Sequence, residues 1–162
     1  QAVPNQCELD TTYLLMASQW ASLSRARRKK VGCLIVKDGA IISDGYNGTP
    51  QGFDNNCEDE VYEEDLPLTC ATPTKQLLIT KPEVLHAESN AITKLAKSTQ
   101  SSLKATMYIT ISPCVECAKL IIQSGIERVV YSDFYRDNKG IQLLRKAHVK
   151  VDQKKLDNLS NL

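Results

Sequence analysis

The sequence of 162 residues lacks the features typical of nucleic-acid-binding and membrane proteins. Its 20 lysines and arginines are nearly balanced by 19 aspartates and glutamates, which gives a formal net charge of +1. Proteins that hold long nucleic acids neutralise many phosphates with basic side chains, so this balance argues against such a partner. No apolar run approaches the roughly 20 residues that cross a bilayer, and residues 1–6 are too polar for a secretion signal. We therefore expect a cytoplasmic protein that binds neither nucleic acid nor a membrane, although a small phosphorylated ligand needs only a few local cations.

Histidine is also scarce: the chain has only His86 and His148, beside six cysteines. Six cysteines could form three disulfides. However, Cys114 and Cys117 form a C-x-x-C pair typical of metal binding, and Cys33 lies in an apolar run where a reduced thiol packs well. A reducing compartment is therefore the better interpretation.

Hydrophobic periodicity predicts a single α/β domain over residues 1–162, because a chain of this length builds one core. Helices are expected within roughly the first two dozen residues and at about residues 87–95, 114–124 and 141–147. Strands are expected at 31–36, 40–43, 105–111, 128–131 and 148–151, the first two forming a hairpin. Residues 45–52 are rich in turn-forming residues and predict a loop. Residues 53–85 show no sustained periodicity and predict a long loop insertion, which in a compact domain is usually functional or disordered.

One motif dominates the sequence: His86-Ala87-Glu88, followed by Pro113-Cys114-Val115-Glu116-Cys117. This H-x-E…P-C-x-x-C arrangement is the known signature of zinc deaminases. It offers one imidazole and two thiolates, whereas a closed structural zinc site normally has four protein ligands. The motif therefore predicts a catalytic zinc site with a coordination position left for water.

The spacing within the motif has a physical basis. Pro113 suits the start of a helix, and Cys114 and Cys117 then share one face of its first turn. The helix N-terminus and the metal both lower thiol pKa values, which favours thiolates. Glu88 is close enough to His86 to contact the bound water without replacing it. Our hypothesis is that Glu88 takes the proton of the water that attacks C4 of a pyrimidine, passes it to the ring nitrogen, and then protonates departing ammonia.

Two alternatives do not involve catalysis at this site. The first is a structural zinc site or an unrelated C-x-x-C pair, and the second is a nucleotide sensor that uses zinc for folding. A closed structural site would be favoured by a second C-x-x-C pair or a second histidine at ligand spacing, and the sequence has neither. Glu88 argues against the sensor, because a purely structural site has no use for an uncoordinated carboxylate at that position.

Two further segments are candidates for binding phosphate. The basic run from Arg25 to Lys30 could hold a substrate phosphate or an effector triphosphate, and we favour Arg27. The glycines of the segment 45–52 would let backbone amides approach phosphate oxygens closely. The acidic group between Glu58 and Asp65 is expected to face solvent.

Over nearly its whole length the chain resembles the deoxycytidylate deaminases of the cytidine deaminase-like superfamily. The matching stretches are Val31–Val36, Gly45–Gly52, His86–Ile92, Ser112–Ile122 and Ser132–Asp137. The resemblance implies a three-layer α/β/α fold with a mixed five-stranded sheet, and a homo-oligomer that is often a hexamer. It also implies zinc-dependent hydrolysis of dCMP to dUMP and ammonia.

The resemblance assigns roles to individual residues. Glu88 would be catalytic, with His86, Cys114 and Cys117 as the zinc ligands. Asn47 would contact the sugar, and the expected substrate-binding set is Asn47, Ala87, Ser112, Pro113, Arg27 and Tyr135. Many relatives are activated by dCTP, here expected as Mg²⁺-dCTP, and inhibited by dTTP. Their effector site lies between subunits and would here involve Gly45, Tyr46, Gly48 and Gly52.

Several alternatives stay open at this stage. Some family members carry a second, structural zinc, which this chain could bind only by bringing together Cys7, Cys57, Cys70 and His148 from distant segments. The substrate could be dCTP as well as dCMP, or free cytidine. A tRNA adenosine deaminase is a further alternative, although such enzymes usually present a basic surface to the anticodon arm.

Overall fold

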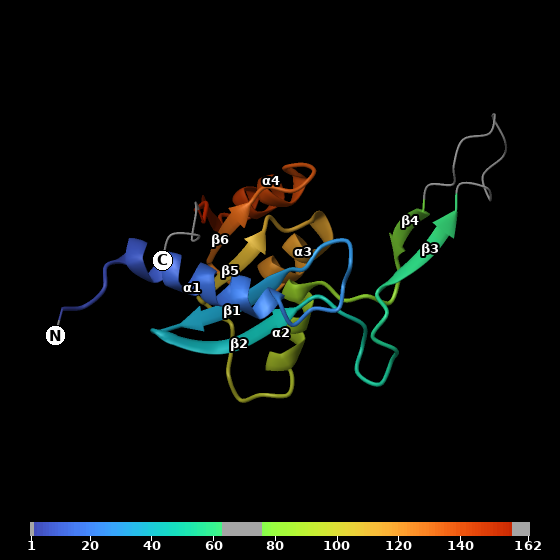
Figure 1. The fold of residues 1–162 in the computed structure, drawn as a ribbon. Coiled ribbons are helices and arrows are strands. Elements are labelled where there is room, and N and C mark those ends of the chain that lie inside the picture. The colour runs from blue at the N-terminus through green and yellow to red at the C-terminus, as the bar shows by residue number, and fades with distance from the viewer. Residues whose placement is uncertain (1, 63–75, 157–162) are drawn as a thin grey trace.

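A mixed five-stranded sheet forms the centre of the computed structural model, which describes residues 2–62 and 76–156 (Figure 1). The strands lie in the order β2-β1-β5-β6-β7. Their bounds are β1 Gly32–Lys37, β2 Ala40–Tyr46, β5 Thr106–Ile111, β6 Arg128–Asp133 and β7 Lys150–Gln153. β1 is antiparallel to both of its neighbours, whereas β5, β6 and β7 are parallel. The predicted hairpin and the predicted mixed sheet are both confirmed.

Helices cover both faces of this sheet. They are α1 Gln6–Ala21, α2 Ala87–Leu95, α3 Val115–Gln123 and α4 Lys139–Lys146. α1 packs on one face, against β1, β5 and β6. α2, α3 and α4 pack on the other, in a core that includes Ala91, Ile121 and Leu144. The predicted three-layer α/β/α architecture is therefore confirmed.

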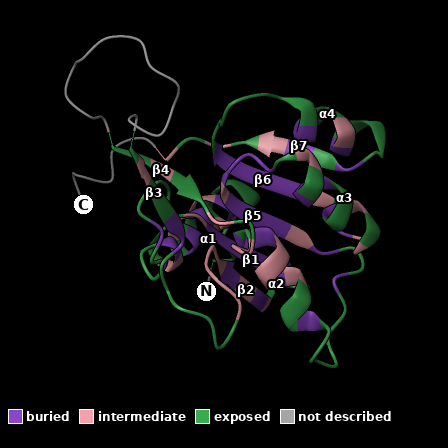
Figure 2. Cartoon of the chain, turned by 90° about the vertical axis from the view of Figure 1, so that its right-hand side faces the viewer, coloured by how far each residue is buried: buried purple, intermediate pink, exposed green. Residues whose placement is uncertain are grey.

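Side chains that alternate along a strand contribute to the hydrophobic cores on both faces of the sheet. In β1, Cys33 and Ile35 face the three-helix layer, while Leu34 and Val36 face α1. Because both faces of the inner strands are covered, these strands are almost continuously buried, as Figure 2 shows for β5 and β6. No helix within the described residues is long and apolar enough to span a membrane. The cytoplasmic location stays a prediction.

A buried ionic cluster fastens α1 to the sheet. Both carboxylate oxygens of Asp10 accept hydrogen bonds from the Arg128 guanidinium, at 2.8 and 2.7 Å, and the Tyr108 hydroxyl donates at 2.7 Å. Burial alone would raise the pKa of Asp10, but these hydrogen bonds lower it to about 2. α1 therefore docks through a specific charged contact as well as through apolar side chains.

Residues 53–85 are not the structureless loop that the sequence suggested. β3 (Glu58–Tyr62) and β4 (Gln76–Thr80) pair antiparallel in a separate two-stranded sheet that projects from the body (Figure 1). Most side chains of the two strands are exposed or only partly buried. A strand that covers no core needs no alternation of apolar and polar residues, so the periodicity that identifies strands was missing. Residues 63–75, including Cys70, lie outside the described part of the chain.

The predicted loop at 45–52 begins later than expected, because β2 continues through Gly45 and Tyr46. Gly45 lies against α2: a Cβ atom there would stand 2.4 Å from the carbonyl oxygen of Ala87. Its missing side chain thus permits close strand–helix packing, which differs from the phosphate approach that we expected. Beyond β2, Gly48 exchanges backbone hydrogen bonds with Leu85, just ahead of α2.

Candidate metal centre and active site

Three side chains from two helix N-termini converge as the sequence predicted. His86 is the N-cap of α2 and Cys114 the N-cap of α3, with Cys117 in the first turn of α3. Nδ1 of His86 lies 3.6 Å from Sγ of Cys114 and 3.3 Å from Sγ of Cys117. In a tetrahedral site with Zn–S of about 2.3 Å and Zn–N of about 2.0–2.1 Å, neighbouring ligand atoms are roughly 3.5 Å apart. The three donors therefore fit zinc in both chemistry and spacing.

The electrostatics of the two thiols are also those of a metal site. Hydrogen bonds from Cys117 and His86 lower the pKa of Cys114 to about 3. The same contact with Cys114, together with burial, raises the pKa of Cys117, because two adjacent sulfurs do not both hold a negative charge unaided. A bound cation removes that repulsion, so zinc binding is expected to release the remaining proton.

Glu88 lies in the first turn of α2 and is 4% exposed. Burial raises its pKa to about 7. A carboxyl group with a pKa near neutrality can both accept and return a proton, as a general acid–base catalyst must. Its side chain shares a cavity with His86 and Cys114.

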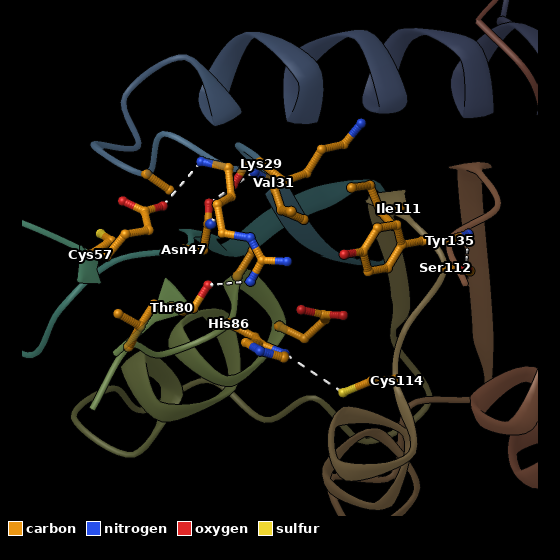
Figure 3. A pocket seen from close by; sticks show the side chains of 16 residues that line it. Lys29, Val31, Asn47, Cys57, Thr80, His86, Ile111, Ser112, Cys114 and Tyr135 are labelled. Atoms are coloured by element: carbon orange, nitrogen blue, oxygen red, sulfur yellow. Dashed lines mark hydrogen bonds between the residues drawn. The ribbon is translucent and has the colours of Figure 1, made fainter. Parts of the chain in front are cut away.

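This cavity has a volume of about 150 Å³ and runs from the metal centre to a basic segment (Figure 3). It lies where β5 and β6 end and the next helices begin, the usual ligand position in open α/β sheets. The lining residues are Ala26, Arg28, Lys29, Val31, Asn47, Cys57, Glu58, Thr80, Val84, His86, Ala87, Glu88, Ile111, Ser112, Cys114 and Tyr135. Figure 3 shows the Tyr135 ring directed into the cavity, and the Ser112 hydroxyl accepts a 2.9 Å hydrogen bond from the Tyr135 backbone N–H.

Two polar side chains hold the basic segment in place at the far end of the cavity. Glu58 accepts hydrogen bonds from the backbone N–H groups of Arg27 and Arg28, at 2.8 and 3.1 Å. Asn47 accepts from the Val31 N–H and donates to the Lys29 carbonyl, both at 2.8 Å. The basic segment is therefore fixed by two side chains that lie far from it in sequence.

The conformation of this segment corrects the prediction for Arg27. Its guanidinium points away from the cavity to Glu60, at 2.7 Å, and Arg27 does not line the cavity. Arg28 and Lys29 line it instead, and Arg28 donates to the Thr80 hydroxyl at 3.1 Å. The sequence identified the basic run but could not show which of its residues face inward.

The other predicted substrate residues divide in the same way. Asn47, Ala87, Ser112 and Tyr135 line the cavity, whereas Pro113 does not. Pro113 instead belongs to the backbone that presents Cys114. This backbone is in tight contact with Gly140 of α4, where a Cβ atom would stand 2.0 Å from the Pro113 carbonyl oxygen.

Glu58 is a charged site residue that the sequence analysis missed. We expected it to face solvent with the rest of the acidic group, but it is 1% exposed and lines the cavity. The only sequence signal was its position as the first acidic residue after the apolar thiol of Cys57, which is a weak indication of burial.

Of the predicted effector residues, Tyr46 and Gly48 line a second cavity of about 330 Å³ together with Arg25 and Thr49. Gly45 and Gly52 do not line it. Among the described residues, His86, Cys114 and Cys117 form the only group of three potential metal ligands. Cys7, Cys57 and His148 do not assemble into a second site, and Cys70 is not described.

Comparison with known proteins agrees with this geometry. The profile of the family described as "Cytidine and deoxycytidylate deaminase zinc-binding region" matches residues 7–133. Deoxycytidylate deaminase of Enterobacteria phage T4 is 35% identical, over 94% of this chain and 93% of its own. The human deoxycytidylate deaminase is 39% identical, over 78% of this chain and 66% of its own.

Solved structures show the same relationship. The dCMP deaminase of cyanophage S-TIM5, crystallised with dCMP and dUMP, superposes with a TM-score of 0.79 at 36% identity, covering 93% of this chain and 100% of that one. A structure from a study of tRNA:A34 deaminases reaches a TM-score of 0.54 at 20% identity, which shows a shared fold alone. The match along the zinc-binding region and the assembled His-Cys-Cys cluster together place this chain in the cytidine and deoxycytidylate deaminase family, as a zinc-dependent deaminase.

Proposed function

We propose that this enzyme hydrolyses dCMP to dUMP and ammonia. The observation that carries the proposal is a single cavity with a buried acid–base carboxyl, Glu88, beside three zinc ligands at one end and two basic side chains, Arg28 and Lys29, at the other. Such a cavity suits a pyrimidine with a phosphorylated sugar. The deoxycytidylate deaminases of phage T4 and of human, and the S-TIM5 enzyme bound to dCMP and dUMP, support the choice of substrate.

His86, Cys114 and Cys117 would hold the zinc ion, which supplies Lewis acidity that makes water a stronger nucleophile. Glu88 accepts a proton from the attacking water and delivers it to N3 of the cytosine ring. Addition of the water oxygen at C4 gives a tetrahedral adduct. Glu88 then takes the proton of the new C4 hydroxyl and transfers it to the amino group. The C4–N bond breaks to release ammonia as the C4=O bond of dUMP forms. Burial of Glu88 keeps its pKa near 7, so that it can serve in both directions.

The rest of the cavity would orient the nucleotide. Arg28 and Lys29 are the cations available to the 5′-phosphate. The hydrogen bond from Arg28 to the Thr80 hydroxyl fixes the orientation of its guanidinium. Val31, Val84 and Ile111 give apolar walls for the base. Tyr135 closes the side near Ser112. We retain Asn47 as a substrate-binding residue, although both ends of its amide already hold the segment 29–31.

Measuring ammonia release from dCMP, dCTP, deoxycytidine, cytidine and a tRNA anticodon arm tests this proposal. We expect the highest kcat/KM with dCMP, because its 5′-phosphate can pair with the two basic side chains. A preference for dCTP would point to the broader nucleotide deaminase that the sequence left open. Reaction with tRNA alone would contradict the proposed substrate, and no reaction with any of them would favour the nucleotide sensor.

Regulation by dCTP and dTTP stays a prediction, now with a candidate location. The cavity lined by Arg25, Tyr46, Gly48 and Thr49 adjoins the active site, since Asn47 and Cys57 line both cavities. An effector bound there, as Mg²⁺-dCTP or as dTTP, would contact Asn47. Because Asn47 hydrogen-bonds the segment 29–31, a shift of Asn47 would move that segment as well. Sigmoidal dCMP kinetics that dCTP makes hyperbolic would support this site. Hexamer formation also remains a prediction, which the mass of the protein in solution would test.

A further inference from the structure

The segment 46–48 is hydrogen-bonded to α2 on both sides of the first turn of that helix. Gly48 and Leu85 exchange backbone hydrogen bonds: the Gly48 N–H donates to the Leu85 carbonyl at 3.1 Å, and the Leu85 N–H donates back at 2.8 Å. One turn further along, the side-chain amide of Asn90 donates to the Tyr46 carbonyl at 2.8 Å. The first turn of α2, which carries the acid–base carboxyl, is therefore held against this segment at its start and at its end.

The same three residues are also hydrogen-bonded to the basic segment. The Asn47 side chain binds the Val31 N–H and the Lys29 carbonyl, both at 2.8 Å, and its backbone N–H donates to the Val31 carbonyl at 3.3 Å. The Ser24 hydroxyl donates to the Asn47 carbonyl at 2.7 Å. Every polar group of Asn47 is thus engaged. The segment 46–48 consequently connects the first turn of α2 to the backbone of the basic segment.

This connection bears on catalysis because a phosphorylated nucleotide is held at both of its ends. Once Arg28 and Lys29 bind the 5′-phosphate, the distance between the two ends of the cavity decides where C4 of the pyrimidine lies relative to Glu88. Binding energy from a remote group of the substrate can be used to position the reacting centre. A displacement of about 1 Å can cost on the order of 10²-fold in rate. The spacing between the phosphate site and Glu88 must therefore be maintained.

The Asn90 amide contributes to this connection without taking part in the backbone hydrogen bonds of α2. It reaches the Tyr46 carbonyl where β2 and α2 are in close contact, since a Cβ atom at Gly45 would stand 3.2 Å from the Cβ atom of Asn90. We propose that Asn90 is a positioning residue: its hydrogen bond to Tyr46 maintains the spacing between Glu88 and the phosphate-binding side chains. This inference rests on the proposed function, since it takes dCMP as the substrate, with its phosphate at the basic segment.

A double-mutant cycle on the zinc-loaded enzyme tests this role, with Asn90→Ala, Arg28→Gln and the variant that carries both. Asn90→Ala removes the donor, keeps the Cβ atom and suits a helix. We expect it to lower kcat for dCMP by roughly 10- to 100-fold and to leave KM within about threefold, because the phosphate still binds but the pyrimidine is displaced from Glu88. In the Arg28→Gln background the same substitution should cost less than about threefold in kcat/KM, since a nucleotide held less firmly by its phosphate can follow Glu88.

Thr93→Ala is the matched control, because the exposed Thr93 hydroxyl bonds within α2, to the Ser89 and Asn90 carbonyls. It should leave kcat and KM near wild type. Rates are expressed per bound zinc, so that metal-free or unfolded protein does not contribute to the comparison.

Equal costs of Asn90→Ala in the two backgrounds would overturn the inference and assign Asn90 to general support of α2. A loss confined to KM, no loss at all, or a variant that no longer folds or binds zinc would overturn it as well. A wild type inert toward dCMP but active on another substrate, or an Arg28→Gln variant with unchanged kinetics toward dCMP, would instead refute the proposed function or its phosphate site.

Discussion

The two ends of the active-site cavity are built in different ways. The metal end comes from two short segments, each at the start of a helix, so that residues close in sequence are close in space. The nucleotide end gathers residues from four places: several from the basic segment, and one each from the position after β2, from β3 and from β4. The metal end could be predicted from a sequence motif, because its geometry is local. The nucleotide end could not, because it depends on tertiary packing.

The difference extends to what each end needs from its surroundings. At the metal end, α2 and α3 fix the ligands through their N-caps, and Gly45 and Gly140 let neighbouring elements approach closely. At the nucleotide end, Glu58 and Asn47 hold the basic segment through hydrogen bonds. We therefore expect substitutions at the metal end to affect kcat or zinc content, and those at the nucleotide end to affect substrate choice.

The largest expected effect is that of Glu88→Gln. Loss of the acid–base group should lower kcat for dCMP by about 10²–10⁴ or more, with zinc content and melting temperature almost unchanged because the amide is isosteric. Ammonia release, elemental analysis and thermal melting measure the three quantities. Glu116→Gln, an exposed residue in the same metal motif, is the control and should behave as wild type. Full activity in Glu88→Gln would refute the role of Glu88.

The next effect separates two neighbouring arginines. Arg28→Gln should lower kcat/KM for dCMP by roughly 10- to 100-fold, because a charged contact with the phosphate is lost. It should change little for deoxycytidine, which has no phosphate. Arg27→Gln should leave both values near wild type, since its guanidinium pairs with Glu60 outside the cavity. A loss with dCMP in Arg27→Gln but not in Arg28→Gln would support the original prediction that Arg27 binds the phosphate.

Gly140→Ala tests how α4 supports the metal end. The added Cβ would stand 2.0 Å from the Pro113 carbonyl oxygen, so the backbone at Pro113 and Cys114 must move. We expect the free energy of unfolding to fall by about 1–3 kcal/mol and the affinity for zinc to drop. Gly48→Ala is the control, because a Cβ there meets nothing within 4 Å. Unchanged zinc affinity and stability in Gly140→Ala would show that this contact is not needed.

The smallest expected effect concerns acid stability. The pKa of Asp10 is about 2 in the folded protein, whereas an unperturbed aspartate has a pKa of 3.8. As pH falls, the unfolded state therefore takes up the proton first. The cluster with Arg128 thus stabilises the fold above about pH 4, and this contribution, on the order of 1–2 kcal/mol, is lost as pH falls toward 2. Asp10→Asn should be less stable than wild type at pH 7 and should approach it at low pH. A constant difference between pH 7 and pH 3 would contradict the assignment.

Sequence reasoning succeeded where local chemistry decides the structure. His86, Glu88, Cys114 and Cys117 were placed at two helix starts, and the structure brings them together there. The sequence analysis missed the two-stranded sheet of β3 and β4, because this sheet buries no apolar face. Arg27 was chosen over Arg28, and Glu58 was assigned to solvent, because burial in these segments depends on which backbone groups a distant carboxylate and amide bind. Those partners are separated from the segment by some 16 to 31 residues, a distance at which periodicity carries no information.

The central claim is that the His86-Cys114-Cys117 cluster holds the zinc ion on which deamination depends. The most direct test is to remove metal with a chelator and then titrate zinc back while following conversion of dCMP to dUMP. We predict that activity is lost on chelation and returns in proportion to zinc, reaching its maximum at one ion per chain. Activity that persists in metal-free protein, or that zinc at this stoichiometry does not restore, would contradict the account.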